Sequence, residues 1–401
     1  MAPSAVDIPV GSPPIPKVEL DHNSDDFKSR NAGPLKKTGV LDSAFEFEDV
    51  TPTIGREYPK TRIVEDLLQA EDADELIRDL AITISERGVV FFRAQDSLTD
   101  DLQKELILRL GALTGRPLSS TVHIHPTLNS TNEFGVSDAE ISTISSHRRK
   151  KLYFTPERAS LRKNTRSTEA SWHSDIQFEE VPADYTSLRL VELPENGGDT
   201  LWASGYDIYD RFSAPYQKFF DSLTATYSGE GFLKAVAAGR AQLFTGSRGS
   251  PLNTGGKLQA VHPLVRTNPV TGWKSIFTVG NFPKFINELD PEESDELLKK
   301  FYSLLLDNHD LQVRFKWRNK NDIAIWDNRS VFHSATFDYD GLGERSGHRV
   351  VGIGEKPYFD PKSKSKAQAL AEEAATKEAA DGVVVEKGVD VKVSDVKEVT
   401  V

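Results

Sequence analysis

The stretch Ile323–Ala335, IAIWDNRSVFHSA in one-letter code, consists of two short apolar runs separated by a polar Asp-Asn-Arg turn. A strand that contains Ile323 and Ile325 is expected to end at this turn, and a new strand is expected to begin near His333. From that position the His333 imidazole could act as the third ligand of a site built by another strand. A histidine that is simply hydrogen-bonded within the core is an equally good interpretation of this stretch alone.

Short apolar runs of the same kind recur through the middle of the chain. Strands are predicted at Val89–Phe92, Tyr185–Val191, Ser275–Val279, Leu311–Trp317, Ile323–Trp326 and Val350–Ile353. Another strand is predicted to begin at Thr200, after a Gly- and Asn-containing turn. Helices are predicted at Asp72–Ser85, Leu98–Leu110 and Glu292–His309. Many short strands with a few helices predict a mainly β fold with flanking helices, arranged as a double-sheet jelly roll (double-stranded β-helix).

The segment Ala170–Phe178 contains Trp-His-Ser-Asp, with an imidazole and a carboxylate two residues apart. If this segment is a strand, His173 and Asp175 lie on the same face, because strand side chains alternate with a period of two. These two ligands and a third from elsewhere would form the two-histidine, one-carboxylate triad of non-haem Fe(II) oxygenases. The chain has nine histidines, so roughly one His-x-Asp is expected by chance. The motif therefore needs support from other parts of the chain.

Two arginines near the end of the apolar region point to an anion. In a strand, Arg345, Gly347 and Arg349 share one face. Burying a guanidinium is costly unless an anion pairs with it, and arginine matches the oxygens of carboxylates and sulfonate-like anions. The pattern indicates an anion site in which the glycine leaves room for a ligand. An exposed edge strand with two solvated arginines is the alternative.

Four motifs occur in the order Trp-His-x-Asp, Gly-Gly-Asp-Thr-Leu-Trp, Trp-Asp-Asn-Arg-x-x-x-His-x-Ala and Arg-x-x-x-Arg. In this order they resemble the TauD/TfdA family of Fe(II)- and 2-oxoglutarate-dependent dioxygenases. The resemblance implies the jelly-roll fold and an enzyme that requires Fe(II), 2-oxoglutarate and O2. It also implies that His173, Asp175 and His333 bind the iron, and that Thr200 and Arg345 hold the far carboxylate of 2-oxoglutarate.

The stretch Thr121–Pro126, with its His-Ile-His-Pro, is similar to the taurine dioxygenase branch of that family. This resemblance implies that His125, Arg349 and the backbone N–H of Ile176 bind a substrate sulfonate. Such donors suit a tetrahedral anion in a dry pocket. As an alternative, His123 and His125 have the spacing of a metal-binding pair.

Two positions depart from the taurine enzymes. Leu128 and Glu169 stand where those enzymes place the aromatic and amide residues that hold the substrate amine. Leu128 favours more apolar sulfonates, Glu169 could still pair with an ammonium group, and Gly347 would enlarge the pocket. The sequence thus resembles fungal-type sulfonate dioxygenases with a relaxed chain-length preference.

The reaction implied by the resemblance is hydroxylation of the carbon next to sulfur in an alkyl or amino sulfonate. The product releases sulfite and an aldehyde, while 2-oxoglutarate becomes succinate and CO2. One alternative is the same chemistry on another substrate: a carboxylate such as a phenoxyacetate, a sulfate ester, or a purine. A second alternative, of a different class, is a non-enzymatic jelly-roll binding or storage protein.

The 401-residue chain has a formal net charge of −12 and no cysteine. The negative charge argues against nucleic acids and anionic membranes as partners, and the absence of cysteine excludes disulfides, thiolate-zinc sites and Fe–S clusters. No apolar run approaches the length of a membrane span. We expect a cytoplasmic enzyme that binds a small anionic substrate; a homo-oligomer is compatible with the sequence.

Because the motifs extend from His125 to Arg349, a single catalytic domain is predicted at residues 46–360. Residues 1–45, rich in Pro, Ser, Lys and Asp, are expected to form an extended or disordered arm. Residues 361–401 form a low-complexity tail in which residues 367–380 could be a short helix. The polar segment 127–171 is predicted to be a long loop of the kind that can serve as a lid.

Overall fold

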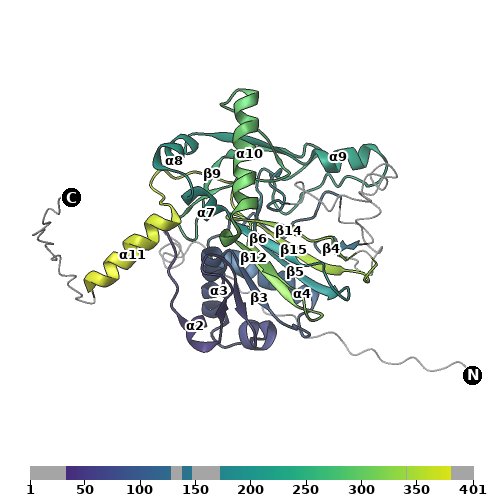
Figure 1. The fold of residues 1–401 in the computed structure, drawn as a ribbon. Coiled ribbons are helices and arrows are strands. Elements are labelled where there is room, and N and C mark those ends of the chain that lie inside the picture. Colours follow the sequence, from purple (N-terminus) through teal and green to yellow (C-terminus); the bar gives the residue numbers. More distant parts are fainter. Residues whose placement is uncertain (1–32, 128–137, 147–171, 340, 381–401) are drawn as a thin grey trace, which may run out of the picture.

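The structure, a computed structural model, describes residues 33–127, 138–146, 172–339 and 341–380. Its largest element is a seven-stranded sheet in the order β1-β2-β3-β13-β5-β15-β4 (Figure 1). The strands are Glu48–Asp49 (β1), Arg56–Tyr58 (β2), Val89–Phe92 (β3), Ile323–Asp327 (β13), Ala183–Glu192 (β5), Ser346–Ile353 (β15) and Ser142–Ser145 (β4). Neighbouring strands of this sheet are antiparallel except β2 and β3, which are parallel.

A second sheet packs against one face of the first. It has the order β12-β6-β14 and consists of Gln312–Phe315 (β12), Thr200–Ser204 (β6) and Val331–Ala335 (β14). Aromatic side chains fill the space between the sheets. The ring of Trp202 lies 5.4 Å from Phe91 and 5.7 Å from Trp326, measured between centroids. Burying each of these side chains contributes about 1.5–3 kcal/mol, which holds the two sheets together.

Alternation along the strands makes both faces of the larger sheet apolar. Val89 and Phe91 pack into the core between the sheets, whereas Val90 and Phe92 pack against α3 (Ala73–Arg87) and α4 (Asp100–Ala112) on the other side. Strands buried on both faces are continuous apolar runs in the sequence. The outer face of the second sheet belongs to a further core, which includes α7 (Gly205–Asp210), α8 (Ala214–Phe220) and α10 (Pro291–Asp307).

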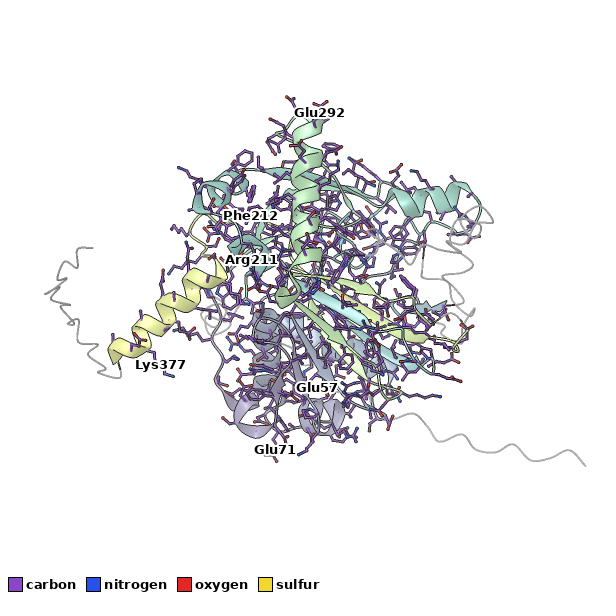
Figure 2. All side chains as sticks on the ribbon, viewed as in Figure 1. Glu57, Glu71, Arg211, Phe212, Glu292 and Lys377 are labelled. Carbon is purple, nitrogen blue, oxygen red and sulfur yellow. The ribbon has the colours of Figure 1, made fainter. Side chains whose placement is uncertain are left out.

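Smaller elements complete the described parts of the chain. They are α2 (Val40–Ala44), the π-helix η1 (Ile63–Leu68), α9 (Glu230–Ala237), the 3-10 helix η3 (His309–Leu311), α11 (Lys366–Ala380), a sheet of β11 (Pro283–Ile286), β7 (Thr224–Ser228) and β8 (Gln259–Pro263), and a pair of β9 (Val265–Thr267) and β10 (Lys274–Ile276). Glu292 in α10 and Lys377 in α11 lie at the periphery (Figure 2). No helix among the described residues has the length and apolar character needed to span a bilayer.

Most of the elements predicted from the sequence are confirmed. The three predicted helices correspond to α3, α4 and α10, and the predicted strands correspond to β3, β5, β10, β12, β13 and β15. A strand also begins at Thr200, and another, β14, contains His333. The predicted helix at residues 367–380 is present as α11. Lys366 Nζ anchors its start, 3.0 Å from Asp207 Oδ2, and most of its remaining side chains are exposed.

Two predictions, one for the segment around His173 and one for the loop that precedes it, are wrong. The segment around His173 is not a strand, because His173 forms a single isolated bridge and the chain turns at Asp175. The predicted long loop at residues 127–171 contains a strand, β4, which pairs with the edge of β15. The remainder of that loop, 128–137 and 147–171, lies outside the described residues, and its proposed action as a lid stays a prediction.

The predicted N-terminal arm and C-terminal tail are described only in part. Residues 33–45 include α2, and Leu41 of this helix is buried in the core formed with α3. This part of the arm therefore packs against the domain. Residues 1–32 and 381–401 lie outside the described residues.

Candidate metal centre and anion sites

Backbone pairing brings His173 and His333 together. The His173 N–H donates to the His333 carbonyl at 3.1 Å, and the His333 N–H donates to the His173 carbonyl at 2.8 Å. The two imidazole rings are consequently adjacent, with centroids 4.3 Å apart. Because His333 lies in β14, this single bridge attaches His173 to the second sheet.

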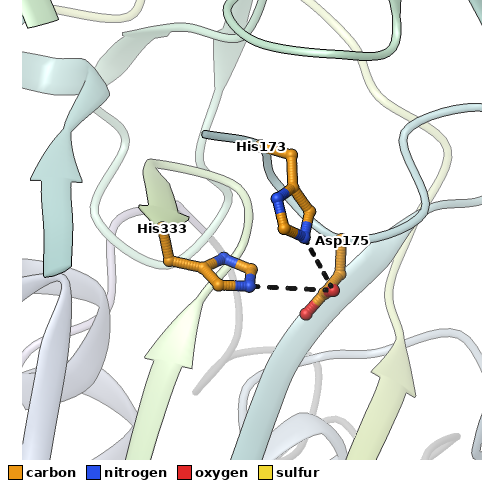
Figure 3. A group of neighbouring side chains, drawn as sticks. All are labelled: His173, Asp175 and His333. Carbon is orange, nitrogen blue, oxygen red and sulfur yellow. Dashed lines mark ion pairs between the residues drawn. The ribbon is translucent and has the colours of Figure 1, made fainter. Parts of the chain in front are cut away.

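Asp175 completes the cluster (Figure 3). Its Oδ1 lies 3.8 Å from His173 Nε2 and 3.9 Å from His333 Nε2, and the candidate ligand atoms of the three side chains all lie within 4.8 Å of one another. In the described part of the chain this is the one group of three or more histidine or acidic side chains that could hold a metal ion.

The protonation states of these side chains fit a divalent metal. Burial, followed by the neighbouring His173, lowers the pKa of His333 to about 3, so the imidazole is neutral. Burial alone would raise the pKa of Asp175, but Arg349 and the two imidazoles hold it below its usual value. Metals bind neutral imidazole and ionised carboxylate. Asp175 Oδ2 is buried and makes no hydrogen bond among the described residues, so the carboxylate keeps acceptor capacity for a cation.

Thr200 and Arg345 lie together, as expected for a carboxylate clamp. Arg345 Nη2 donates to Thr200 Oγ1 at 3.2 Å, and its Nε donates to the Gly198 carbonyl at 2.8 Å. Thr200 Oγ1 also accepts from Trp317 Nε1 at 3.2 Å. Gly198 is required here: its φ is +71°, and a Cβ would lie 3.0 Å from Arg345 Cδ.

Among the described residues, Arg345 is a buried cation without an acidic partner. It is 4% exposed, and no described carboxylate forms an ion pair with it. Burial lowers its pKa to about 10, which still leaves it charged at neutral pH. An uncompensated buried charge is costly, so this position is suited to an anionic ligand.

Arg349 has a contact that the sequence did not predict. Its Nη1 donates to Asp175 Oδ1 at 2.7 Å, next to the candidate metal site. Its Nε is buried and has no hydrogen-bond partner in the described parts of the chain. Arg349 thus combines a contact to a candidate metal ligand with unused donor capacity.

The prediction that Gly347 leaves room for a ligand is wrong. A Cβ at this position would lie 2.5 Å from Leu190 Cδ2 and 2.9 Å from Leu188 Cδ1. Side chains of the neighbouring strand β5 fill the space beside the glycine. Gly347 therefore permits close packing of β15 on β5.

A chain of aromatic contacts links His125 to the metal cluster. It is buried, and its Nδ1 accepts a hydrogen bond from the Thr127 N–H at 3.1 Å. Its ring packs edge-on against Phe232 at 4.9 Å. Phe232 lies 6.2 Å from Phe282, which in turn lies 6.0 Å from His173, all between centroids. Both phenylalanines are partly exposed. Because Phe282 contacts His173 and Phe232 contacts Phe282, the two rings form an apolar wall beside the cluster.

His123 belongs to a different network. Its Nε2 lies 3.2 Å from Glu179 Oε1, and Arg248 pairs with both oxygens of Glu179 at 2.6 and 2.8 Å. These three side chains are almost completely buried. His123 and His125 are not part of the metal group found in the described residues, which argues against the alternative metal pair.

Of the three remaining predicted site residues, the structure describes only Ile176. Ile176 is buried directly after Asp175 and has a φ of +50°. Leu128 and Glu169 lie outside the described residues. Sequence reasoning missed several residues around the site: Asn328, Glu179, Arg248, Phe232, Phe282 and Trp317. Of these, Asn328, Trp317 and Glu179 lie in or beside stretches that the sequence had singled out.

A two-histidine, one-carboxylate cluster, together with a buried arginine that has no acidic partner among the described residues, is typical of a mononuclear metal oxygenase that uses an anionic cosubstrate. Comparison with known proteins supplies the family. The model of the family "Taurine catabolism dioxygenase TauD, TfdA family" matches residues 46–351. The chain therefore belongs to the TauD/TfdA family of 2-oxoglutarate-dependent dioxygenases, and it is an enzyme that uses Fe(II), 2-oxoglutarate (alpha-ketoglutarate) and O2.

Individual relatives support the same assignment. The chain is 47% identical to the alpha-ketoglutarate-dependent dioxygenase oryG of Aspergillus oryzae, over 84% of this chain and 96% of the relative. It is 30% identical to the alpha-ketoglutarate-dependent sulfonate dioxygenase of Saccharomyces cerevisiae, over 86% and 74%. The crystal structure of a taurine dioxygenase from Burkholderia xenovorans superposes with a TM-score of 0.56 at 25% identity, over 80% and 92%. Enzymatic relatives of this kind argue against the alternative of a non-enzymatic binding protein.

Proposed function

We propose that this enzyme oxidises alkyl and amino sulfonates at the carbon next to sulfur, releasing sulfite and an aldehyde. One oxygen atom of O2 would enter the substrate, and the other would enter succinate as 2-oxoglutarate loses CO2. The observation that carries the proposal is Arg349, a buried guanidinium beside Asp175 whose Nε has no hydrogen-bond partner among the described residues. His123 N–H bonds to the Val351 carbonyl at 2.8 Å, and Val122 bridges Gly352. These contacts place the His125 segment beside β15, the strand that carries Arg349, although Arg349 itself is flanked by Ser142 of β4 and Leu188 of β5. In this proposal His125 and Arg349 meet the same anion.

The chain's own residues divide the work as follows. His173, Asp175 and His333 would hold the metal, and Thr200 and Arg345 would bind the far carboxylate of 2-oxoglutarate. Bound Fe(II) supplies the redox chemistry with O2 and a site for the 2-oxo acid group. His125, Arg349 and the Ile176 N–H would orient the sulfonate so that the adjacent carbon faces the metal. The aromatic wall of Phe232 and Phe282 would keep water away from that carbon.

The two packed sheets support assignment of the catalytic domain, residues 46–360, as a double-stranded β-helix. The solved structures that this chain resembles include one from Burkholderia xenovorans that is described as a taurine dioxygenase. Cytoplasmic location, the absence of nucleic-acid and membrane partners, and assembly into a homo-oligomer remain predictions from the sequence.

A second candidate is the same chemistry on a different anion. Relatives at 47% identity, from Aspergillus oryzae and Neocamarosporium betae, are named only as alpha-ketoglutarate-dependent dioxygenases, whereas two relatives named for sulfonates are 29% and 30% identical. The partly exposed phenylalanines also leave one side of the site apolar. Carboxylates such as phenoxyacetates, sulfate esters and purines are therefore the substrates to test beside sulfonates.

The decisive experiment is a substrate panel with the Fe(II)-loaded full-length enzyme. Taurine, straight-chain alkyl sulfonates, an alkyl sulfate ester, a phenoxyacetate and a purine are each incubated with 2-oxoglutarate. Succinate, sulfite, sulfate, glyoxylate and the purine oxidation product are then measured. We expect sulfite and succinate in equal amounts with at least one sulfonate. Succinate coupled only to sulfate, glyoxylate or purine oxidation would replace the sulfonate assignment while leaving the family chemistry intact.

Arg349→Ala is expected to raise the KM for the sulfonate about 10- to 100-fold, because a hydrogen bond to a charged group contributes about 1.5–3 kcal/mol. At saturating Fe(II), the KM for the cosubstrate should change much less. Arg189→Ala is the matched control, since Arg189 is a buried arginine of β5 that pairs with Asp100 on the helix-covered side. If Arg349→Ala weakened the use of the cosubstrate more than that of the sulfonate, the two arginine roles would be reversed.

A further inference from the structure

Asn328 occupies the turn between β13 and β14 and is 1% exposed. All the hydrogen-bonding atoms of its side chain, and its backbone N–H and carbonyl, have partners in the structure. A buried amide with every group satisfied is held in one orientation, and it holds its partners equally firmly.

One set of these bonds reaches the metal-binding turn. Asn328 Oδ1 accepts from the Asp175 N–H at 3.0 Å, and the Asn328 carbonyl accepts from Ser174 Oγ at 2.7 Å. Oδ1 also accepts from Trp326 Nε1 at 3.0 Å, which ties it to the core between the sheets. Two consecutive residues of the turn, Ser174 and Asp175, are therefore attached to Asn328.

The other set of bonds reaches β5, an inner strand of the larger sheet. Asn328 Nδ2 donates to the Asp184 carbonyl at 3.0 Å and to Thr186 Oγ1 at 2.8 Å, and its backbone N–H donates to the same carbonyl at 2.8 Å. Strand β5 lies between β13 and β15. Asn328 therefore connects the turn that carries Asp175 to the most firmly paired part of the sheet.

The turn needs such support because its backbone is strained. Ile176 follows Asp175 directly and has a φ of +50°, a region that a β-branched residue rarely adopts. A residue held in such a region costs about 1–3 kcal/mol and persists only when its surroundings determine it. Asn328 fixes the two residues before Ile176, and the Glu179 N–H bonds to the Ile176 carbonyl at 3.0 Å on the other side.

We infer that Asn328 is a positioning residue that sets the place of the Asp175 carboxylate before a metal ion binds. Without it, the strained turn would relax, and Asp175 would have to be reordered each time a metal is bound. The inference rests on the metal-binding part of the proposed function and is independent of the substrate.

The test is metal affinity of the full-length protein, measured anaerobically with Fe(II) and separately with Mn(II) as the only ligand. Asn328→Leu removes the side-chain bonds at nearly constant volume, and we expect the dissociation constant to rise about 10- to 100-fold, as for other residues that orient metal ligands. With Co(II), the ligand-field spectrum of the variant should differ from that of the wild type, because Asp175 is no longer held in place.

Asn253→Leu is the matched control. Asn253 is as buried as Asn328 and makes two side-chain bonds, both to the backbone of Val181, at 2.8 and 2.9 Å. This control should lower the melting temperature but leave the metal dissociation constant within about twofold of the wild type. Equal losses of affinity in the two variants would overturn the inference in favour of a general loss of stability.

Ser174→Ala covers the case in which Asn328→Leu does not fold. It removes only the bond from Ser174 Oγ, and we expect a rise of about 3- to 10-fold in the metal dissociation constant. Unchanged affinity in a folded Asn328 variant, or in Ser174→Ala where the former does not fold, would refute the positioning role. Failure of the wild type to bind metal would instead refute the metal site itself.

Discussion

His173→Ala is expected to abolish Fe(II) binding and 2-oxoglutarate turnover. The variant removes one of three side chains whose ligand atoms lie within 4.8 Å of one another. A bound metal contributes several kcal/mol to catalysis, and each 1.36 kcal/mol corresponds to a factor of ten in rate. Succinate formation should therefore fall at least about 1,000-fold. The measurements are anaerobic Fe(II) titration and succinate release, with and without a prime substrate.

His348→Ala is the control for this variant. His348 lies in β15, but its Nδ1 contacts Asp100 at 2.7 Å on the side of the sheet covered by α4, away from the metal cluster. Its loss should leave Fe(II) binding unchanged. Wild-type Fe(II) affinity in folded His173→Ala would contradict the assignment of the cluster as the metal site.

The sequence predicted those parts of the site that depend on local patterns, such as apolar runs and the spacing of charged residues. Apolar runs marked the strands on which Thr200 and His333 lie, because strands buried on both faces have few polar residues. Arg345 and Arg349 are both less than 10% exposed, which argues against the alternative of two solvated arginines. Arg345 lies just before β15 and the register shifts between Ser346 and Gly347, so a common strand face for the two arginines stays a prediction. The order of the motifs then indicated the family.

The errors arose where a local pattern could not report a distant partner. His173 and Asp175 were expected on one face of a strand, but His173 pairs with β14 through a single bridge and Ile176 then turns the chain away. The glycine between the arginines suggested an open pocket, yet the side chains of β5 fill that space. A pattern with period two describes a strand only if a neighbouring strand continues beside it.

The residues that were missed act through contacts between distant segments. Glu179 contacts His123 and Arg248, which lie 56 and 69 residues away in the sequence. Asn328 bonds to Asp175 from a distance of 153 residues. Neither contact leaves a periodic or compositional signal in a single sequence. The pairing of Arg349 with Asp175 is of the same kind, since the two residues are 174 positions apart.

Arg345→Met is expected to separate cosubstrate binding from folding more clearly than any other substitution in this chain. Arg345 is buried and forms no ion pair with a described carboxylate, so within the described structure its charge has no acidic partner. Removing one partner of a buried charged pair costs about 2–5 kcal/mol. The dissociation constant for the cosubstrate 2-oxoglutarate should therefore rise by a factor on the order of 100 to 1,000.

The folding stability of the same variant, unlike its affinity for the cosubstrate, should not decrease. Replacing an unpaired buried charge by an apolar side chain of similar volume is neutral or stabilising, so the ligand-free melting temperature should stay the same or rise. The pKa of Arg345 is lowered to about 10 from an ordinary value above 12. The group is thus charged in both the folded and the unfolded chain below pH 9, and this effect should not depend on pH between 6 and 9.

Thr200→Val completes the comparison, because it removes the acceptor for Arg345 Nη2 and Trp317 Nε1 but leaves the positive charge in place. Loss of a neutral hydrogen bond costs about 0.5–1.5 kcal/mol, so the dissociation constant for the cosubstrate should rise only about 3- to 10-fold. The measurements are calorimetric titration with 2-oxoglutarate in the presence of Mn(II), and the increase in melting temperature that 2-oxoglutarate produces. That increase should be nearly intact in Thr200→Val and absent in Arg345→Met. A full increase in Arg345→Met would show that the far carboxylate of 2-oxoglutarate binds elsewhere, and the unpaired charge would then belong to the prime substrate.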